Sequence, residues 1–183
     1  PTFQGEGPSL GRRCTFVRLG GCNLHCVWCD TPYTWDWTGR NGKTYNPRRE
    51  LKKISIADVW ADVESQQTGM LVVTGGEPLL QQDGLVELVH RAKNAGWWVE
   101  VETAGSIEPS PAVVELVDGF NVSLKLANSG NDLKERLSEL AISALQLSGK
   151  AQWKFVVTGL DDLEEIRVLA EEFGLRPSWV MPE

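Results

Sequence analysis

The stretch GCNLHCVWCD, from Gly21 to Asp30, holds three of the four cysteines of a 183-residue chain. Cys22, Cys26 and Cys29 are separated by one gap of three residues and one gap of two. Cys26 and Cys29 are too close in sequence to close a large disulfide loop, and the chain's first residues have no signal-peptide pattern. In a reducing compartment, clustered thiols more often bind metal or carry out redox chemistry. The spacing therefore indicates a metal or redox centre.

Two kinds of metal centre fit this cysteine pattern. Zinc takes four ligands, usually as two separated pairs, and here only Cys14 or His25 could complete a set of four. Cys14 stands in an alternating stretch typical of a strand, which favours a buried structural thiol, and His25 is equally well explained by solvent exposure. A 4Fe–4S cubane usually takes four cysteines, so three thiolates suit a cluster with one open iron.

Composition and charge limit the class of protein to which the chain can belong. The chain is 42% hydrophobic and 23% charged, as is usual for a globular protein, and no apolar run is long enough to cross a bilayer. Its net charge of −7 argues against binding to a nucleic-acid backbone. We therefore expect one cytoplasmic domain over residues 1–183, with neither nucleic acid nor membrane as partner. The start at Pro1 and the stop at Glu183 indicate that short segments are missing at both ends.

Apolar runs that alternate with helical patterns predict a parallel α/β fold. The expected strands are Thr15–Leu19, Met70–Thr74, Trp97–Glu102, Phe120–Leu124, Gln152–Val157 and Ser178–Met181. The first expected helix starts after Ser55, which is its N-cap. Three further helices are expected over Leu79–Gly96, Asp132–Leu145 and Asp161–Gly174. About six βα units are too few for the eight of a closed barrel. Active groups should then lie at the C-terminal ends of the strands.

A second stretch, MLVVTGGEPLL from Met70 to Leu80, passes from an apolar strand through two glycines into a helix. Glycines at such a turn let the backbone approach a ligand closely. Taken alone, the stretch is better explained as a plain strand-to-helix turn, because Gly-Gly and Glu-Pro are common in turns.

Together, the cysteine loop and the GGEP turn resemble the radical S-adenosylmethionine superfamily, in which three cysteines hold a 4Fe–4S cluster and S-adenosylmethionine binds its open iron. Further stretches narrow the resemblance: FQGEG at 3–7, CDTPYTWD at 29–36, ETAG at 102–105, SLK at 123–125 and QWKFVV at 152–157. In this order they resemble the 7-carboxy-7-deazaguanine synthase family over nearly the whole chain. ETAG and SLK differ slightly from the family's usual ETSG or ETNG and SPK, but neither change removes a side-chain ligand.

The resemblance implies a partial, incomplete TIM-like barrel of about six βα units, of radical S-adenosylmethionine type, and a carbon–nitrogen lyase reaction. In that reaction 6-carboxy-5,6,7,8-tetrahydropterin becomes 7-carboxy-7-deazaguanine with loss of ammonia, in the biosynthesis of 7-deazapurines (queuosine precursors). A 5′-deoxyadenosyl radical removes the hydrogen at C6 of the pterin, and the hydrogen is later returned. The resemblance also implies a homodimer and an electron donor such as flavodoxin or ferredoxin. Two other functions stay open: activation of a glycyl-radical enzyme, and a non-catalytic zinc module.

The resemblance also assigns residues to the two cofactors. Cys22, Cys26 and Cys29 are the cluster ligands and the catalytic residues. The residues implied for S-adenosylmethionine are Trp28, Cys29, Asp30, Gly76, Glu102, Ser123, Lys125, Met181, Pro182 and Glu183.

For the substrate, the resemblance implies contacts from Phe3, Gln4, Gly5, Arg18 and Thr74. A bidentate guanidinium such as that of Arg18 suits a carboxylate. The resemblance also implies that Thr31 binds a Mg²⁺ ion, which prefers oxygen ligands and keeps several waters.

Some of these residues have a simpler interpretation. Thr31 precedes Pro32 and could be a turn cap. Lys125 and Glu102 could form a surface ion pair, which would contribute little to stability. Arg18 could be an ordinary arginine at the end of a strand. The aromatic stretch YTWDW, at 33–37, is expected to pack as core or as dimer surface.

Overall fold

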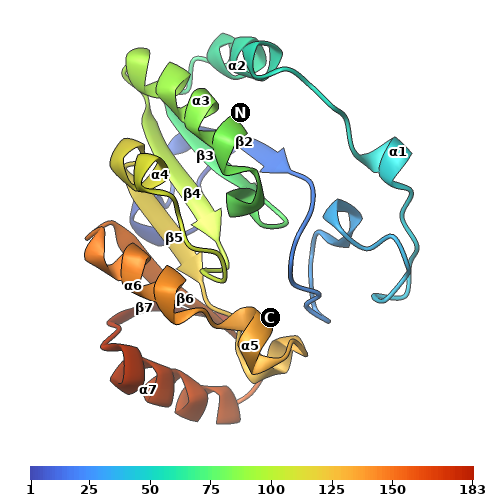
Figure 1. The fold of residues 1–183 in the computed structure, drawn as a ribbon, viewed down its shortest axis with the longest axis vertical. Helices are drawn as coiled ribbons and strands as arrows, with labels where there is room; N and C mark the ends of the chain where they lie inside the picture. Colours follow the sequence, from blue (N-terminus) through green and yellow to red (C-terminus); the bar gives the residue numbers. More distant parts are fainter.

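Seven strands form one curved sheet in the computed structural model, which describes the backbone of residues 1–183 and all side chains except those of residues 177 and 178 (Figure 1). The strands follow one another in chain order across the sheet. They are β1 (Thr2–Phe3), β2 (Arg13–Leu19), β3 (Met70–Gly75), β4 (Trp98–Thr103), β5 (Gly119–Ser123), β6 (Ala151–Val157) and β7 (Pro177–Pro182). β1 pairs with β2 in antiparallel fashion, and β2 to β7 are parallel.

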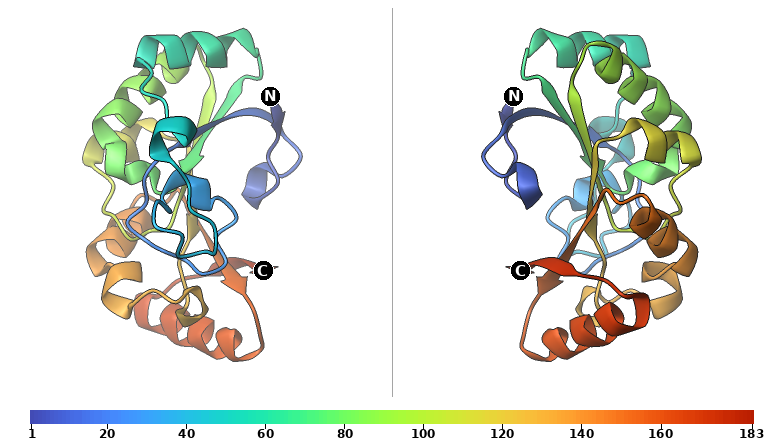
Figure 2. Two further views of the ribbon diagram at one scale, coloured as in Figure 1. Left: turned by 90° about the vertical axis from the view of Figure 1, so that its right-hand side faces the viewer. Right: turned by 90° about the vertical axis from the view of Figure 1, so that its left-hand side faces the viewer.

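Helices cover one face of the sheet, and the N-terminal segment lies at the opposite face (Figure 2). The α-helices are α1 (Pro47–Glu50), α2 (Ile56–Ser65), α3 (Gln82–Asn94), α4 (Pro111–Leu116), α5 (Leu133–Arg136), α6 (Glu139–Leu147) and α7 (Asp161–Phe173). Short 3₁₀ turns are η1 (Gly7–Ser9), η2 (Pro32–Thr34), η3 (Pro78–Gln81) and η4 (Ala127–Ser129). Six adjacent parallel strands with helices on one side confirm the predicted partial barrel.

All six predicted strands are present, with ends that differ by one or two residues. β3 is buried at all but its last position, as expected for a parallel strand covered on both faces. No sequence pattern predicts β1, because two residues are too few for an alternating pattern. In the part of the chain that the structure describes, no helix is long and apolar enough to cross a membrane.

Two of the predicted helices are divided in the structure, although several predicted helix ends agree with it. The segment predicted as one helix over Leu79–Gly96 is divided at Gln81 into η3 and α3, and Gly96 follows its end in the left-handed conformation, as expected. Ser55 caps α2 by accepting from the N–H of Asp58, and α7 stops at Gly174 in the left-handed conformation. The single helix predicted over Asp132–Leu145 is wrong, because the chain leaves helical geometry at Leu137. Ser138 then caps a new helix by accepting from the N–H of Ala141, which divides the segment into α5 and α6.

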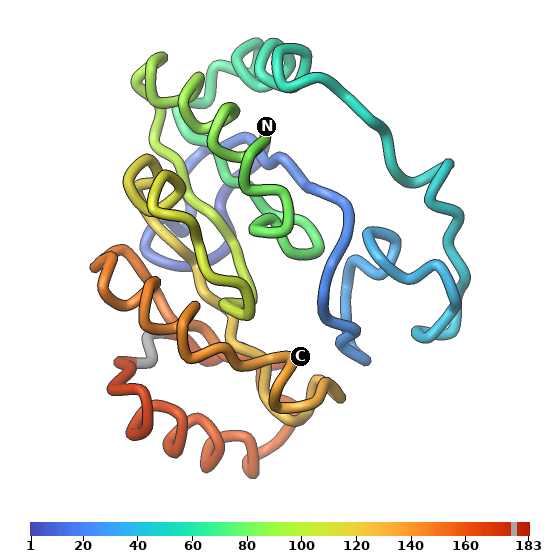
Figure 3. Tube along the Cα trace, in the orientation of Figure 1, coloured from blue at the N-terminus to red at the C-terminus, as the bar shows by residue number. Residues whose placement is uncertain are grey.

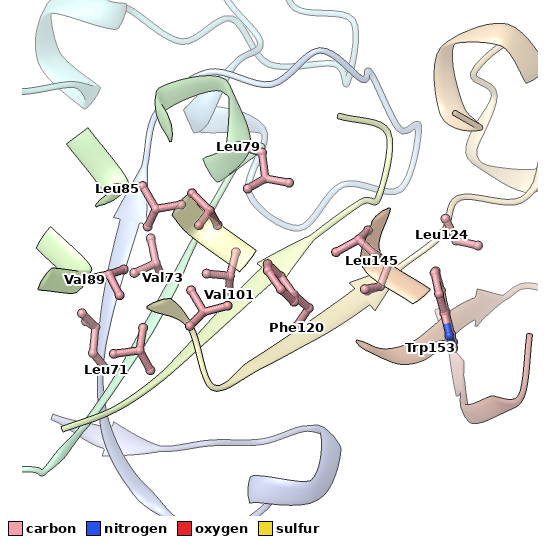
Figure 4. Packing of buried hydrophobic residues seen from close by; sticks show 14 of the residues in the cluster. Leu71, Val73, Leu79, Leu85, Val89, Val101, Phe120, Leu124, Leu145 and Trp153 are labelled. Carbon is pink, nitrogen blue, oxygen red and sulfur yellow. The ribbon is translucent and has the colours of Figure 1, made fainter. Parts of the chain in front are cut away.

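The hydrophobic core lies between the sheet and its helices. Outward-facing strand residues such as Val73, Val101 and Phe120 pack with helix residues such as Leu85 and Leu145 (Figure 4). Side chains alternate along a strand, so the residues between these core residues point to the opposite, concave face of the sheet. Several of them are polar. The core therefore fixes which side chains line the concave face.

Between β2 and α2 the chain makes a long excursion that carries the cysteine loop (Figure 3). The buried carboxylate of Asp36 accepts hydrogen bonds from the backbone N–H groups of Thr38, Gly39, Arg40 and Asn41. Burial alone would raise the pKa of Asp36, but these four hydrogen bonds lower it overall. Hydrogen bonds between the backbone and the Asp36 side chain thus hold the part of the excursion that lies between η2 and α1.

Candidate active site

A cavity of about 570 Å³ opens at the C-terminal ends of the parallel strands. It brings together fifteen of the residues singled out in the sequence. They are Gly5, Arg18, Cys22, Cys26, Trp28, Cys29, Asp30, Thr31, Thr74, Gly76, Glu102, Ser123, Lys125, Pro182 and Glu183. The position agrees with the expectation that active groups gather at this end of the barrel.

Strand register explains why distant residues meet in this cavity. Arg18 of β2 is paired with Thr74 of β3, and Glu102 of β4 is paired with Asn121 of β5. Val73 and Val101, one residue earlier, are paired across β3 and β4. Arg18, Thr74, Glu102 and Asn121 therefore form one row across four neighbouring strands, and all four line the cavity.

The GGEP turn is locked to the start of the cysteine loop. Gly76 N–H donates to the carbonyl of Leu19 at 3.0 Å, and Glu77 N–H donates to that of Gly21 at 2.9 Å. A Cβ atom on Gly76 would lie 2.1 Å from the Gly21 oxygen and 2.8 Å from Cys22 Cβ, so only glycine fits. Of the two backbone groups of Gly76, only the carbonyl can accept a hydrogen bond from an amino group.

Glu77 ties this turn to the next strand, a role that the sequence reasoning missed. Its fully buried carboxylate accepts from the Thr103 hydroxyl at 2.9 Å and from the N–H groups of Ala104 and Leu79 at 2.8 and 3.0 Å. Burial raises the pKa of Glu77, and these donors oppose the rise. The stretches GGEP and ETAG were each recognised, but nothing in either indicates that they bind each other.

The three clustered thiols line the cavity, and each sulfur faces an N–H donor. Trp35 Nε1 lies 3.3 Å from Cys29 Sγ, Asn131 Nδ2 lies 3.3 Å from Cys26 Sγ, and the backbone N–H of Leu24 lies 3.4 Å from Cys22 Sγ. Such bonds stabilise thiolates and tune the potential of iron–sulfur clusters.

Burial raises the pKa of Cys22 to about 12 and also raises that of Cys26. A buried thiolate at these positions therefore needs a metal centre to offset the cost of its charge. The donor set, three thiols in one cavity with N–H groups around them, fits an iron–sulfur cluster.

Within the described residues, no three His, Cys, Asp or Glu side chains are grouped closely enough to hold a single metal ion. A cubane is larger than one ion and binds each thiolate through a different iron, so its ligands need not meet at one point. Cys14 is fully buried with Met70 and Val72, outside the residues that line the cavity, and His25 packs edge-on against Trp35. The prediction that Cys14 is a buried structural thiol is confirmed, and the zinc module loses its fourth ligand.

Lys125 and Ser123 form a polar corner next to Trp28. Lys125 Nζ donates to Ser123 Oγ at 2.8 Å and lies 5.5 Å from the centre of the Trp28 ring. Burial lowers the pKa of Lys125, which nearby thiols and Glu77 partly oppose. Among the ion pairs of the described side chains, none joins Lys125 to Glu102, so the simple interpretation as a surface pair is wrong.

Thr31 occupies the N-cap position of η2, but across the described structure its hydroxyl makes no capping hydrogen bond. Instead, the hydroxyl lies 3.8 Å from Cys29 Sγ, and its own carbonyl accepts from Thr34 Oγ1 at 2.8 Å. The side chain is 8% exposed and lines the cavity. The hydroxyl therefore lies beside the Cys29 sulfur, on a residue that lines the cavity, and does not cap the described turn.

Three of the predicted site residues lie off the described lining of the cavity. Phe3 is 65% exposed in β1, at the edge of the sheet. Gln4 is buried, and its Nε2 donates to Glu100 at 3.4 Å and to Glu102 at 3.3 Å. Met181 belongs to β7, but only its neighbours Pro182 and Glu183 line the cavity.

Other lining residues were not singled out from the sequence. Lys154 pairs with Glu6 of the FQGEG stretch, and both line the cavity. Strand alternation could have found Lys154, because Trp153 and Phe155 on either side of it are buried in the core. Trp35, which we expected to be core or dimer surface, is 7% exposed and contacts a cysteine sulfur.

Comparison with known proteins agrees with this arrangement. A family model described as a 4Fe-4S single cluster domain matches residues 3–147. A 7-carboxy-7-deazaguanine synthase from Pyrobaculum aerophilum is 39% identical over 175 residues, which are 95% of this chain and 71% of the relative. Another from Hyperthermus butylicus is 30% identical over 190 residues, covering 99% and 73% of the two chains.

A solved structure supports the same grouping. The crystal structure of QueE from Escherichia coli superposes with a TM-score of 0.69 at 27% identity, covering 99% of this chain and 79% of that one. Three observations agree with one another: the matches in sequence, the partial barrel, and the three thiols in one cavity. The chain belongs to the 7-carboxy-7-deazaguanine synthase family of radical S-adenosylmethionine enzymes.

Proposed function

We propose that this chain converts 6-carboxy-5,6,7,8-tetrahydropterin to 7-carboxy-7-deazaguanine with loss of ammonia. The observation that carries the proposal is one cavity that holds both the three thiols and the row Arg18, Thr74 and Glu102. When bound, the cluster and S-adenosylmethionine supply the one-electron chemistry that starts the reaction. The protein's own residues bind and orient the reactants.

Each wall of the cavity suits one part of the reactants. Lys125, Ser123 and the Gly76 carbonyl offer a cation, a hydroxyl and an acceptor, which fit the carboxylate, ribose and amino groups of S-adenosylmethionine. The guanidinium of Arg18 is suited to the substrate carboxylate. Glu102 is an acceptor for ring N–H groups, and burial raises its pKa, an effect that the negative charge of Glu6 increases.

The direct test is turnover under anaerobic conditions. We expect the chain, reconstituted with iron and sulfide and supplied with reductant, S-adenosylmethionine and the carboxypterin, to release 7-carboxy-7-deazaguanine and one equivalent of ammonia. Mass spectrometry of the products measures this. Absence of the product, with a glycyl radical instead formed on an added partner enzyme, would contradict the proposal and favour the activase.

We also propose that Thr31 binds a Mg²⁺ ion together with oxygens of the substrate. The support is a hydroxyl that lies beside Cys29, on a residue that lines the cavity, and is not used for capping in the described turn. Mg²⁺ prefers oxygen ligands and commonly keeps several waters, so one protein hydroxyl is a sufficient anchor when the substrate completes the shell.

For this ion we expect Thr31→Ala to bind its cluster normally but to lose most of the stimulation of turnover by Mg²⁺. Thr31→Ser keeps the oxygen and is the matched control, so it should retain the stimulation. The measurement is turnover against Mg²⁺ concentration for the three proteins. A full wild-type response in Thr31→Ala would show that the hydroxyl is not a ligand.

The electron donor is proposed to be an acidic flavodoxin or ferredoxin that docks on a basic segment, residues 40–53. Within this segment all six cations are exposed: Arg40, Lys43, Arg48, Arg49, Lys52 and Lys53. The segment is tied to the cysteine loop, because Asn41 Nδ2 donates to the Cys26 carbonyl at 3.1 Å. Val27, between two of the thiols, is 63% exposed. A positive surface of this kind attracts acidic partners and speeds their association.

Charge reversal tests this docking surface. The double change Arg48→Glu with Arg49→Glu should slow cluster reduction by an acidic donor about fivefold at low salt, and added salt should shrink the difference. Reduction by dithionite should be unchanged, since a small reductant needs no docking. Lys134→Glu, exposed on α5, is the control. Equal slowing with both reductants would place the defect at the cluster and not at the surface.

Assembly as a homodimer and a cytoplasmic location remain predictions. The exposed side chains of Phe3 and Leu10, near the β1 edge of the sheet, are apolar groups that such a dimer could cover.

A further inference from the structure

We propose that Asn121 contacts the substrate, with its side-chain oxygen accepting a hydrogen bond from the guanidine-like edge of the pterin. We further propose that Glu100 is the positioning residue that sets the orientation of this amide. The inference deepens the proposed function and rests on it. Neither residue belongs to the stretches by which the family was recognised.

Asn121 stands in the same row as the residues proposed to bind the substrate. It is paired with Glu102, and the row continues through Thr74 to Arg18. It lines the cavity although its side chain is 95% buried, with 5% exposed. Register therefore places it beside Glu102, on the face of the sheet that lines the cavity.

Glu100 lies two residues before Glu102 in β4, so its side chain is on the same concave face of the sheet. It is 4% exposed. One carboxylate oxygen accepts from Asn121 Nδ2 at 3.0 Å and from Gln4 Nε2 at 3.4 Å. The other accepts from Ser9 Oγ at 2.5 Å and from Trp98 Nε1 at 3.1 Å. Four donors thus converge on this carboxylate, so the amide nitrogen of Asn121 is held toward Glu100.

The orientation of Asn121 leaves its oxygen, Oδ1, as the free end of the amide. In the described part of the chain no group donates a hydrogen bond to Oδ1. A Cβ atom on Gly7 would lie 2.5 Å from Oδ1, so the N-terminal segment passes close by and leaves room only because this residue is glycine. An acceptor without a donor, in the wall of a cavity, is available to a ligand.

Two acceptors side by side match the chemistry of the substrate. The guanidine-like edge of a pterin presents N–H donors, and Glu102 and the Asn121 oxygen are adjacent acceptors. Gln4, by contrast, is 1% exposed and donates to both Glu100 and Glu102, off the described lining of the cavity. Asn121 is therefore an amide that lines the cavity, whereas the Gln4 amide braces the two carboxylates by donating to both.

If the amide of Asn121 were flipped, its NH₂ group would face the N–H groups of the pterin. Such a donor–donor contact leaves buried polar groups without partners and weakens binding. Glu100 prevents the flip because a carboxylate can only accept from the amide nitrogen. A glutamine at position 100 could itself donate, so it would allow both orientations.

The test uses the reconstituted holoenzyme and compares wild type, Asn121→Ala, Glu100→Gln and the double variant. Asn121→Ala should raise KM for the carboxypterin about tenfold and leave KM for S-adenosylmethionine unchanged. Glu100→Gln should raise the pterin KM about threefold, and the double variant should resemble Asn121→Ala alone, because Glu100 acts through Asn121. Gln152→Ala, an amide paired with Asn121 but off the described cavity lining, is the control.

Each result decides between the alternatives. A wild-type pterin KM in Asn121→Ala, or an equal rise for both ligands, overturns the contact and leaves a network that only anchors the N-terminal segment. Additive effects in the double variant overturn the positioning role of Glu100. If Glu100→Gln does not fold, Glu100→Asp withdraws the carboxylate from Asn121 and replaces it in the comparison. A wild-type enzyme that makes no 7-carboxy-7-deazaguanine overturns the proposed function itself.

Discussion

The close contact between the Gly75–Gly76 turn and the end of β2 is the constraint on which the site depends. A Cβ on Gly75 would lie 2.2 Å from the Leu19 oxygen, and one on Gly76 would lie 2.1 Å from the Gly21 oxygen. Both of these obstacles are backbone atoms, which cannot turn aside as a flexible side chain can. The two glycines therefore allow the cysteine loop to start directly against the GGEP turn, and Glu77 carries this contact on to β4.

This arrangement places buried polar groups, whose burial costs free energy, on the face of the sheet that lines the cavity. The outward faces of the strands form the core with the helices, so the concave face can hold Glu102, Asn121, Ser123 and Lys125. Burial disfavours the charged forms of Cys22 and Lys125, which makes a metal centre and an anionic ligand favourable partners for them. The apolar packing that stabilises the fold thus lies on the helix-covered face of the sheet, and the residues proposed to bind the reactants lie on the concave face.

Local sequence patterns predicted six of the seven strands, and the family resemblance pointed to most of the cavity lining. Strand and helix periodicity found six strands, and the motifs found Cys22, Gly76 and their neighbours. What the sequence could not show were contacts between distant segments, such as Glu77 with Thr103, because neither partner carries a local signal. Asn121 was missed for the same reason, since its place beside Glu102 comes from register. The break at Ser138 was missed because apolar spacing continued across it.

The central claim is that three thiols, and not the fourth, converge on one cavity to hold a cluster. The most direct measurement is iron and sulfide content after anaerobic reconstitution of four single variants. Cys22→Ala, Cys26→Ala and Cys29→Ala should each lose most of the iron, because two thiolates hold a cubane poorly. Cys14→Ala, which changes a buried core thiol, should keep the wild-type content. Loss of iron from Cys14→Ala, or full retention in any of the other three variants, would contradict the account.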